Sequence, residues 1–397
     1  MEPRSQPLEG VTVIDLGQIY QGAYTSFLLA MAGADVIKVE PPGGERLRGG
    51  TEKPPTLAFA MLNSNKRAVS LDLKEPRGRH LLVELARRGD VLVENYAPGV
   101  LDRLGIGAEL LREANPRLIY ATATGFGITG PDRDQLAMDH TVQAMSGMIS
   151  VTGEKGRPPV RAGGAGADIL GGVHLYGAIV TALVDRERSG VGATVEISMQ
   201  ESMYFTFASA YTNFHHTGRT PGPVGNGPLG LPMPPYNVYE ASDGYLAIIC
   251  VTDEHWRRLA REMGKPELGE DPRFVDRRSR ARHGTEVDAL VGAWVRERTR
   301  EEAWQAARAA RVPAAPVRDL AEVMEDPHMH ERGALQRVDH RELGPVVLPH
   351  SPLRFADAEP LEIQSSPLAG EHNREIYGGW LGLSEAELLE LEREGVI

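Results

Sequence analysis

The first half of the chain alternates short apolar, β-rich runs with longer segments of helical pattern. The short runs favour buried strands, and the longer segments favour helices that bury one face. We expect strands at Val11–Leu16, Asp35–Glu40, Val69–Leu73, Asp90–Glu94, Leu118–Thr122 and Ala193–Ser198, and helices at Tyr24–Met31, Pro76–Arg88, Asp168–Glu187 and Gln200–Tyr211. Strands that alternate with helices predict a parallel, doubly wound α/β sheet.

The segment Asp168–Glu187 is the most helix-like part of the middle of the chain. Its broad apolar face includes Ile169, Val173 and Ile179, and Gly190 follows it as a stop signal. No uninterrupted apolar run in the sequence reaches the roughly 18 residues that a helix needs to span a bilayer. We therefore expect no membrane partner.

A change in composition separates the two halves of the chain. Residues 218–235 are rich in proline and glycine, which predicts a linker or an active-site loop that leads into a smaller domain. The length of 397 residues also favours two domains, because a single hydrophobic core rarely grows that large. The elements expected after the break are a strand at Tyr245–Ile249, helices near Glu254–Met263 and Thr285–Ala309, a return route through Asp319–His330 and Gly344–Phe355, and a tail helix that begins with the capping box Ser384–Glu387.

Composition and charge narrow the class of protein. The formal net charge is −12, and nucleic acid binding normally needs a basic surplus, so we expect no nucleic acid partner. The single cysteine, Cys250, excludes an internal disulfide, and the 12 histidines form no ligand pair at helical spacing, so no metal site is expected. The first seven residues are polar and carry no signal-peptide pattern. A reducing, cytoplasmic location fits these features best.

The clearest candidate for chemistry is Asp168, which follows the small-residue segment 161–167 and precedes the long apolar helix. Small residues let a ligand approach the backbone closely, and backbone N–H groups stabilise a developing oxyanion. A carboxylate at a helix N-terminus stays ionised, which suits a nucleophile. Aspartate is also a favoured helix cap, and from the pattern alone the cap is the more frequent case.

Two polar clusters elsewhere carry weaker signals. Met138-Asp139-His140 offers His140 as a general base, although a lone histidine beside a helix start more often serves packing or lies at the surface. Residues 63–67 and 71–74 supply cations and polar groups between strands. These two segments suit an anion pocket or solvated turns, and composition does not decide between them.

The glycines Gly10, Gly17 and Gly22 lie around the first strand, where a dinucleotide-binding site would begin. Their spacing differs from the G-x-G-x-x-G fingerprint of such sites. Close packing of a helix against a strand explains them better than nicotinamide binding. An NAD-dependent oxidoreductase is therefore a weak alternative.

A set of short segments in a fixed order resembles family III CoA-transferases, the formyl-CoA and carnitine CoA-transferase family. Any one segment is a weak signal, but the ordered set covers nearly the whole chain. The segments are residues 36–44 (VIKVEPPGG), 65–67 (NKR), 71–74 (LDLK), 93–99 (VENYAPG), 115–120 (NPRLIY), 125–127 (GFG), 143–147 (QAMSG), 370–373 (GEHN) and 395–397 (GVI).

This resemblance implies an architecture. Family members form an interlocked homodimer in which each chain is a ring threaded through the other. The large domain has a Rossmann-like core and is built from both ends of the chain. We therefore expect residues 1–217 and 331–397 to form the large, CoA-binding domain, and residues 218–330 to form the linker and a small α+β domain.

The resemblance also implies a chemistry, with Asp168 as the carboxylate nucleophile. CoA would pass from an acyl-CoA donor such as succinyl-CoA to a carboxylic acid acceptor. The intermediates would be an aspartyl mixed anhydride and an aspartyl-CoA thioester. No metal takes part, and Met138, Asp139 and His140 become neighbours of the active site. The positions carried over as CoA contacts are Tyr20, Gln21, Leu71, Asp72, Leu73, Lys74, Asn95, Tyr96, Ala97 and, near the phosphates, Arg103.

The sequence departs from the family pattern at two places. The usual Ala-Gly-Pro after the first strand is Gln21-Gly22-Ala23 here, so the CoA contacts at this turn are expected to differ. The glycine-rich loop that covers the active site of formyl-CoA transferase is replaced by residues 225–230 (GNGPLG). The second departure argues against oxalate as the acceptor.

Two alternatives share the CoA-binding fold. α-Methylacyl-CoA racemase needs a base on each face of the α-carbon, and a histidine precedes its aspartate at the position of Asp139. Here that residue is Met138, which takes no proton, and the racemase glutamate aligns near Thr252. A non-catalytic CoA-binding protein would lack the nucleophile, whereas Asp168 is present. The transferase is therefore the preferred hypothesis.

Overall fold

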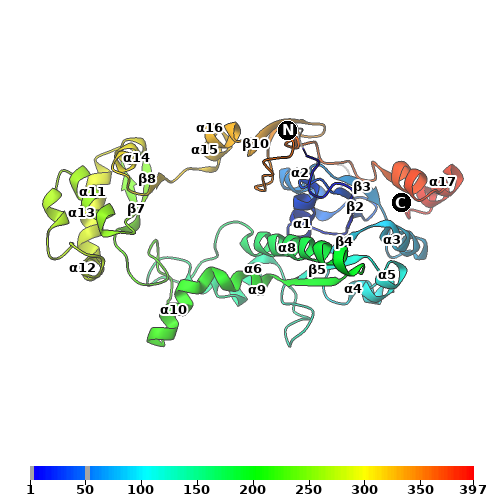
Figure 1. Cartoon of the computed structure of the whole chain (residues 1–397), viewed down its shortest axis with the longest axis horizontal. Helices are drawn as coiled ribbons and strands as arrows, with labels where there is room; N and C mark the ends of the chain where they lie inside the picture. Colours follow the sequence, from blue (N-terminus) through cyan, green and yellow to red (C-terminus); the bar gives the residue numbers. More distant parts are fainter. Residues whose placement is uncertain (1–3, 50–53) are drawn as a thin grey trace. The chain divides into compact units, whose positions relative to one another are not determined.

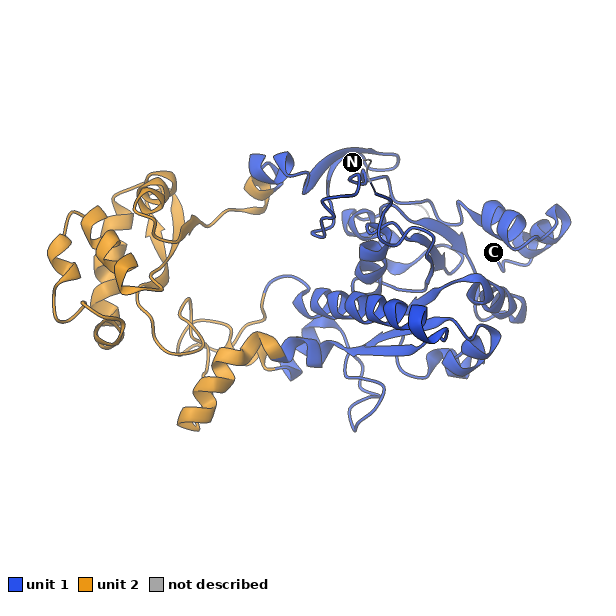
Figure 2. Ribbon diagram, in the orientation of Figure 1, with its two compact units in different colours: residues 1–146, 163–204, 324–397 blue, residues 147–162, 205–323 orange. Residues whose placement is uncertain are grey.

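The structure is a computed structural model that describes residues 4–49 and 54–397. Contacts between residues divide the chain into two compact units (Figure 2). The first unit comprises residues 1–146, 163–204 and 324–397, and the second comprises residues 147–162 and 205–323. Residues 1–3 of the polar N-terminal segment lie outside the described part of the chain. The domain limits expected at residues 217 and 330 stay a prediction.

The first unit is built on a six-stranded parallel sheet in the order β3-β2-β1-β4-β5-β6 (Figure 1). Valine, isoleucine, leucine and alanine dominate its central strands, and nearly all their residues are buried, as a parallel sheet covered on both faces requires. The predicted parallel α/β sheet is confirmed. Its strands are β1 (Thr12–Asp15), β2 (Asp35–Glu40), β3 (Arg67–Ser70), β4 (Val91–Glu94), β5 (Ile119–Thr124) and β6 (Thr194–Ser198).

The strand order reverses between β1 and β4, which pair directly with each other. In open α/β sheets, ligands bind outside the carboxyl ends of the strands at such a reversal. The turn that follows β1, residues 16–20, and the segment that follows β4, residues 95–99, therefore lie where a binding site is expected.

Helices α1 (Gln21–Ala30) and α8 (Gly166–Ser189) pack on one face of the sheet (Figure 1). Leu175 and Ile179 of α8 are fully buried in one cluster with Val13 of β1. Each helix begins next to the carboxyl edge of the sheet, and this packing holds its first turn there. The N-terminus of α8 carries Asp168.

The opposite face is covered by α3 (Pro76–Arg88), α5 (Ala108–Ala114) and the C-terminal tail. The tail contributes Tyr377, which is fully buried in the same cluster as Leu85. The predicted capping box at Ser384 is confirmed, since its hydroxyl accepts the Glu387 N–H and its own N–H reaches the Glu387 carboxylate. The remaining elements of this unit are η1 (Arg46–Arg48), α2 (Leu57–Asn63), α4 (Val100–Arg103), α6 (Asp139–Met145), α9 (Met199–Tyr204), α16 (Pro327–Glu331), the antiparallel pair β10 (Leu335–His340) and β11 (Gly344–Pro349), η4 (Arg374–Trp380) and α17 (Glu385–Arg393).

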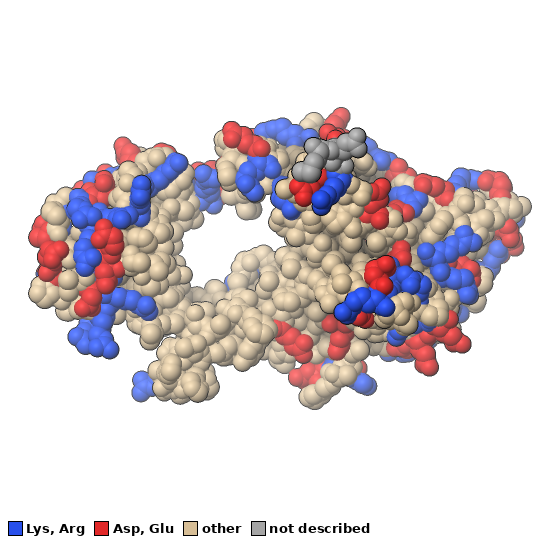
Figure 3. All heavy atoms as spheres, viewed as in Figure 1, with Lys and Arg blue, Asp and Glu red and all other residues tan. Residues whose placement is uncertain are grey.

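The second unit has its own antiparallel sheet and its own core, in which Trp256, Phe274 and Val291 are buried. Side chains of both charges are interspersed over its drawn face (Figure 3), and on one helix Glu254 pairs with Arg258. Its elements are α7 (Met148–Val151), η2 (Phe205–Phe207), α10 (Ala208–Thr217), β7 (Tyr236–Ala241), β8 (Gly244–Ile249), α11 (Asp253–Glu262), η3 (Pro266–Gly269), α12 (Arg277–Arg282), α13 (Gly284–Arg296), α14 (Arg300–Ala309), β9 (Ala314–Pro316) and, at its limit, α15 (Leu320–Met324).

Two predicted helices are interrupted. The segment expected as one helix over Gln200–Tyr211 is divided among α9, η2 and α10. The segment expected over Thr285–Ala309 is divided at Thr299, whose hydroxyl accepts the Glu302 N–H and starts α14 as a new helix. The strand predicted at Val69–Leu73 begins earlier, at Arg67, and ends at Ser70.

The helix α8 needs comment because of its length and composition. It spans 24 residues, and its most apolar window has a mean hydropathy of 1.6. Among the helices that the structure describes, it alone is long and apolar enough to cross a membrane. One face of α8 packs on the sheet, as in the core helix of a soluble protein, and this criterion gives only weak support for a membrane span.

Candidate active site

The turn between β1 and α1 lies so close to the first turn of α1 that neither Gly17 in the turn nor Gly22 in the helix has room for a side chain. A Cβ atom on Gly17 would lie 2.6 Å from the carbonyl carbon of Gly22, and one on Gly22 would lie 2.7 Å from the Cα atom of Gly17. The two glycines therefore let the turn fold back on the first turn of α1. This supports the interpretation of these glycines as packing residues.

Asn95, the first residue after β4, holds this turn. Its side-chain oxygen accepts the Gln18 N–H at 2.7 Å, and its side-chain nitrogen donates to the Gln18 carbonyl at 2.9 Å. The two loops at the strand-order reversal are thereby joined. Of the residues predicted to contact CoA, the structure places Tyr20, Gln21 and Asn95 together at this edge.

Gln21 lies at the start of α1 and faces α8. Its residue is 2% exposed, and among the described residues its Nε2 atom has no hydrogen-bond partner. A Cβ atom on Gly171 of α8 would lie 2.4 Å from this nitrogen. Glycine at 171 therefore leaves the space that the Gln21 carboxamide occupies, one turn after Asp168. The N-termini of α1 and α8 meet through this contact.

Asp168 is the third residue of α8, and Ala165 precedes the helix. The cap hypothesis for Asp168 is therefore wrong, because the helix begins two residues before it. Instead, Asp139 of α6 caps the helix from outside: its Oδ2 atom accepts the Ala167 N–H at 2.8 Å and the Asp168 N–H at 3.3 Å. Its Oδ1 atom accepts a hydrogen bond from Gln143 at 2.6 Å.

The capping contact brings two carboxyl groups to one place. Burial and the charge of Asp139 raise the pKa of Asp168 to about 7. The expectation that the helix N-terminus keeps Asp168 fully ionised is wrong. The N–H groups of Ala167 and Asp168 donate to the Asp139 carboxylate. Near neutral pH the half-buried Asp168 is therefore a carboxylate in part of the molecules.

The two other residues of the Met138-Asp139-His140 cluster behave differently from Asp139. The side chain of Met138 is 55% exposed, and that of His140 is also exposed. Met138 occupies the cap position of α6, where its backbone N–H donates to Thr141 at 3.0 Å. Asp139 is thus the member of the cluster that contacts the backbone at Asp168.

The predicted CoA residues after β3 lie at the same carboxyl edge of the sheet, because parallel strands end together there. Leu71 is 1% exposed and belongs to the core, so its side chain is not open to a ligand. Asp72 and Leu73 are half-buried, and Lys74 is exposed. The Asp72 side chain accepts the Lys74 N–H at 2.8 Å, which shapes the turn.

The remaining predicted contacts follow β4. Tyr96 is half-buried, and burial raises the pKa of its hydroxyl. Ala97 and the exposed Arg103 line a cavity of about 410 Å³ whose polar wall includes Glu94 and Thr122. Arg103 therefore has access to a ligand that lies along this edge.

Sequence reasoning missed a group of buried charged residues beneath the β1–α1 turn. The Lys66 Nζ atom donates to Asp15 at 3.0 Å and to Ser26 at 2.7 Å, and all three side chains are buried. Lys66 was expected in an anion pocket or a solvated turn, and it lies in neither. Charged residues within apolar strands were the available signal, because a buried charge requires a partner.

No group of three or more His, Cys, Asp or Glu residues is placed to hold a metal ion among the residues that the structure describes. This finding covers residues 4–49 and 54–397 only. The carboxyl pair at Asp139 and Asp168 has two members, so it is not such a group.

The family model described as CoA-transferase family III matches residues 8–373. The chain is 34% identical over 411 residues to formyl-CoA:oxalate CoA-transferase of Streptomyces avermitilis, covering 99% of this chain and 100% of that protein. It is 35% identical over 398 residues to succinyl-CoA–D-citramalate CoA-transferase of Chloroflexus aurantiacus, with 99% and 98% covered.

A solved structure extends this similarity to the fold. The CAIB/BAIF family protein from Brucella suis superposes with a TM-score of 0.83 at 32% identity, covering 97% of this chain and 100% of that chain. The chain therefore belongs to CoA-transferase family III and is an enzyme of that class.

Proposed function

We propose that this enzyme moves CoA from an acyl-CoA donor to a carboxylic acid with Asp168 as the nucleophile. The observation that carries the proposal is the carboxyl pair at the start of α8, where Asp139 holds the helix end and Asp168 lacks a cationic partner among the described residues. A carboxylate that no cation neutralises keeps its nucleophilic oxygen available.

The reaction proceeds in two matched halves. The Asp168 carboxylate attacks the thioester carbonyl, the carbon–sulfur bond breaks, and CoA leaves as the thiolate. The thiolate then attacks the aspartyl carbonyl of the mixed anhydride, releasing the donor acid and forming an aspartyl-CoA thioester. The acceptor carboxylate attacks this thioester, and the freed thiolate takes the acceptor acyl group, which regenerates the Asp168 carboxylate.

CoA lies, in this proposal, along the carboxyl edge of the first unit's sheet. The proposed contacts are the predicted set without the buried Leu71: Tyr20, Gln21, Asp72 to Lys74, Asn95 to Ala97 and Arg103, of which Arg103 takes the phosphates. The Gln21 Nε2 atom lies one turn from Asp168 and has no partner among the described residues, so a shift of its buried side chain would let it donate to the thioester oxygen.

The donor proposed is succinyl-CoA, and the acceptor is a mono- or dicarboxylic acid. The similarity to an enzyme named for succinyl-CoA and D-citramalate supports this donor. We also propose the interlocked homodimer and the cytoplasmic location that the family resemblance implies. These assignments rest on family membership.

Trapping of the aspartyl intermediate tests the nucleophile. The enzyme is incubated with succinyl-CoA and hydroxylamine, which converts an activated aspartyl group into a stable hydroxamate, and tryptic peptides are analysed by mass spectrometry. Asp168 falls in the peptide 162–186 and Asp139 in the peptide 134–155, so the two carboxyl groups are distinguished directly. The expected modification is on Asp168.

A modification on the peptide 134–155 would instead assign the nucleophile to Asp139. No modification with succinyl-CoA, acetyl-CoA or formyl-CoA would remove the covalent mechanism. If deuterium exchange at the α-carbon of a 2-methylacyl-CoA accompanied that result, racemase chemistry would replace the transferase proposal.

A further inference from the structure

The backbone at Ile19 adopts a conformation that its side chain disfavours. Its φ angle is 61°, in the left-handed region, which β-branched residues rarely occupy. Ile19 lies directly before Tyr20 and Gln21, at the start of α1. The turn therefore depends on contacts from outside to hold this residue in place.

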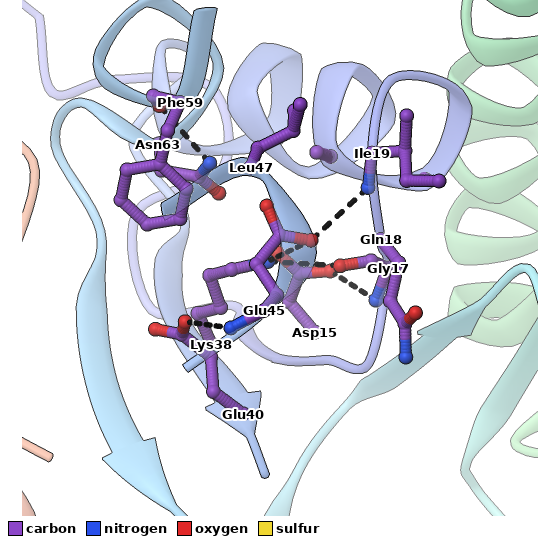
Figure 4. A network of polar contacts seen from close by, with 12 residues as sticks. Asp15, Gly17, Gln18, Ile19, Lys38, Glu40, Glu45, Leu47, Phe59 and Asn63 are labelled. Carbon is purple, nitrogen blue, oxygen red and sulfur yellow. Dashed lines mark hydrogen bonds and ion pairs between the residues drawn. The ribbon is translucent and has the colours of Figure 1, made fainter. Parts of the chain in front are cut away.

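Glu45 provides the contact at Ile19. Its Oε2 atom accepts the Ile19 N–H at 3.0 Å, and the residue is 5% exposed (Figure 4). Its Oε1 atom is buried and has no hydrogen-bond partner within residues 4–49 and 54–397. The Glu45 side chain thus makes one hydrogen bond, and the donor is the N–H of the strained residue Ile19.

Lys38 and Glu40, both on β2, hold Glu45 in position. The Lys38 Nζ atom lies 3.9 Å from the Glu45 carboxylate, and the Glu40 side chain accepts the Glu45 N–H at 3.0 Å. Arg48 in turn binds Glu40 through two hydrogen bonds of 2.7 and 2.6 Å. The support of Glu45 therefore extends from the sheet to the short helix η1.

The same network fixes the rest of the turn. The Lys38 Nζ atom donates to the Gly17 carbonyl at 2.8 Å, and Asp15 accepts the Gly17 N–H at 2.8 Å. With Asn95 on Gln18, side chains bind five backbone groups of three successive residues. This is a rigid support for the two residues that come next.

Stability alone does not account for the Glu45 carboxyl. Burial raises its pKa, and one of its oxygens lacks a partner among the described residues, so its desolvation is not fully compensated. An apolar side chain of similar size would fill the same space without that cost. Only a hydrogen-bond acceptor at this position holds the Ile19 peptide in its observed geometry.

We infer that Glu45, held by Lys38, is a positioning residue that fixes the Ile19 peptide and through it presents Tyr20 and Gln21 to acyl-CoA. The inference rests on the proposed CoA-transferase function and adds a requirement to it. Glu45 contacts no reacting atom; it acts through the backbone of the turn. Its removal therefore weakens CoA binding without unfolding the protein.

The test compares Glu45→Met with Glu45→Gln in the full-length enzyme. Methionine fills the space without an acceptor oxygen, whereas the glutamine amide oxygen still accepts the Ile19 N–H. We expect Glu45→Met to raise the Kd of free CoA, measured by calorimetry, and the KM of succinyl-CoA by about tenfold or more. We expect Glu45→Gln to stay within about threefold of the wild type.

Asn63→Ala is the matched structural control. Asn63 accepts a hydrogen bond from Lys66 and lies in the same buried region, and its described hydrogen bonds go to Lys66 and Phe59, not to residues 17–19. It should lower the thermal midpoint and leave the CoA affinity unchanged. If Glu45→Met and Asn63→Ala lost CoA affinity in proportion to their loss of stability, Glu45 would be a structural residue and the inference would be wrong.

Coupling to Ile19 gives a second test. Glycine adopts φ angles near 61° without steric penalty, so Ile19→Gly should remove part of the requirement for Glu45. The double variant Glu45→Met/Ile19→Gly is therefore expected to bind CoA more tightly than Glu45→Met alone. Simple additivity of the two substitutions would count against the inference.

The two levels of the argument fail in different ways. If the wild type binds free CoA but transfers it to no acid, the proposed function fails, and the CoA affinities of the variants still judge the role of Glu45. If the wild type transfers CoA and Glu45→Met matches it in Kd and KM, the positioning role fails alone.

Discussion

The two helices that meet at the site begin in opposite ways. Beneath the start of α1, carboxylates alternate with lysines: Asp15 pairs with Lys66, and Lys38 lies between Asp15 and Glu45. At the start of α8, Asp139 and Asp168 stand together with no cation bound to either in the described residues. Both regions carry partly or fully buried charge, and they differ in whether that charge is compensated.

The pKa values follow this difference. Although burial acts against ionisation, Lys66 and Lys38 hold the pKa of Asp15 below its usual value, whereas burial and Asp139 raise that of Asp168 to about 7. Burial also lowers the pKa of Lys66 to about 8. The carboxylates that lie beside lysines form a rigid support, whereas a carboxylate beside a second carboxylate suits the reactive role that we propose for Asp168. The predictions below test this contrast.

Removal of the uncompensated carboxyl should have the largest effect on activity. Asp168→Ala is expected to lower turnover by at least about 1000-fold, because the proposed mechanism has no other nucleophile. CoA transfer is measured by chromatography of the acyl-CoA products. Asp185→Ala, at the exposed far end of the same helix, is the control and should retain wild-type turnover. Comparable turnover of both variants would exclude Asp168 as the nucleophile.

Removal of a compensating charge should have the largest effect on stability. Lys66→Met leaves Asp15 buried without its ion pair and is expected to cost about 3–5 kcal/mol of unfolding free energy. Arg77→Met, which breaks partly exposed pairs with Glu390 and Glu394, should cost much less, because water screens these pairs. Chemical denaturation measures both. Equal losses of unfolding free energy in the two variants would show that the buried network around Asp15 does not depend strongly on Lys66.

The contact between the two helix starts is tested by adding one methyl group. Gly171→Ala places a Cβ atom 2.4 Å from the Gln21 Nε2 atom, so the carboxamide must move, and CoA affinity should fall by about tenfold. At Gly177, on the same helix, a Cβ atom meets nothing within 4 Å. Gly177→Ala should therefore leave CoA affinity unchanged and stabilise the helix by up to about 1 kcal/mol. Unchanged affinity in Gly171→Ala would remove Gln21 from the binding site.

The smallest effect concerns pH. The proposed mechanism requires the Asp168 carboxylate, so it predicts that kcat/KM rises as the pH increases through about 7. Asp139→Asn removes the neighbouring charge but keeps an oxygen for the N–H groups of α8, so this limb should move to lower pH. We expect a shift of less than about one pH unit, because burial is the larger cause of the raised pKa. A shift to higher pH would contradict the like-charge contact.

Local pattern was sufficient to predict much of the first unit. The helix Pro76–Arg88 and the strand Asp35–Glu40 agree with the structure at both ends, because a proline in the first turn and the run of proline and glycine after Glu40 fix their limits. The helix breaks near Phe205 and at Thr299 were not predicted, because hydrophobic periodicity continues across them.

The site was harder to predict because its contacts join distant segments. The role of Asp168 was predicted from the family resemblance and stays a prediction, whereas the cap that Asp139 provides spans 29 residues and has no local signal. The hydrogen bond from Lys38 to the Gly17 carbonyl likewise joins β2 to the turn that follows β1. Such contacts follow from the parallel sheet, which brings the ends of separate strands to one edge, and not from the pattern around any one residue.

The route of the chain through the first unit affects how the protein is made. The outer edge of β3 is covered by the end of the chain: His372 accepts the Ala68 N–H, Asn373 accepts the Ser70 N–H, and Tyr377 donates to the Ser70 carbonyl. When residues 1–217 have been synthesised, the edge strand β3 is therefore still open to pairing with other chains. Residues 372–377 must therefore be synthesised and docked before that edge closes.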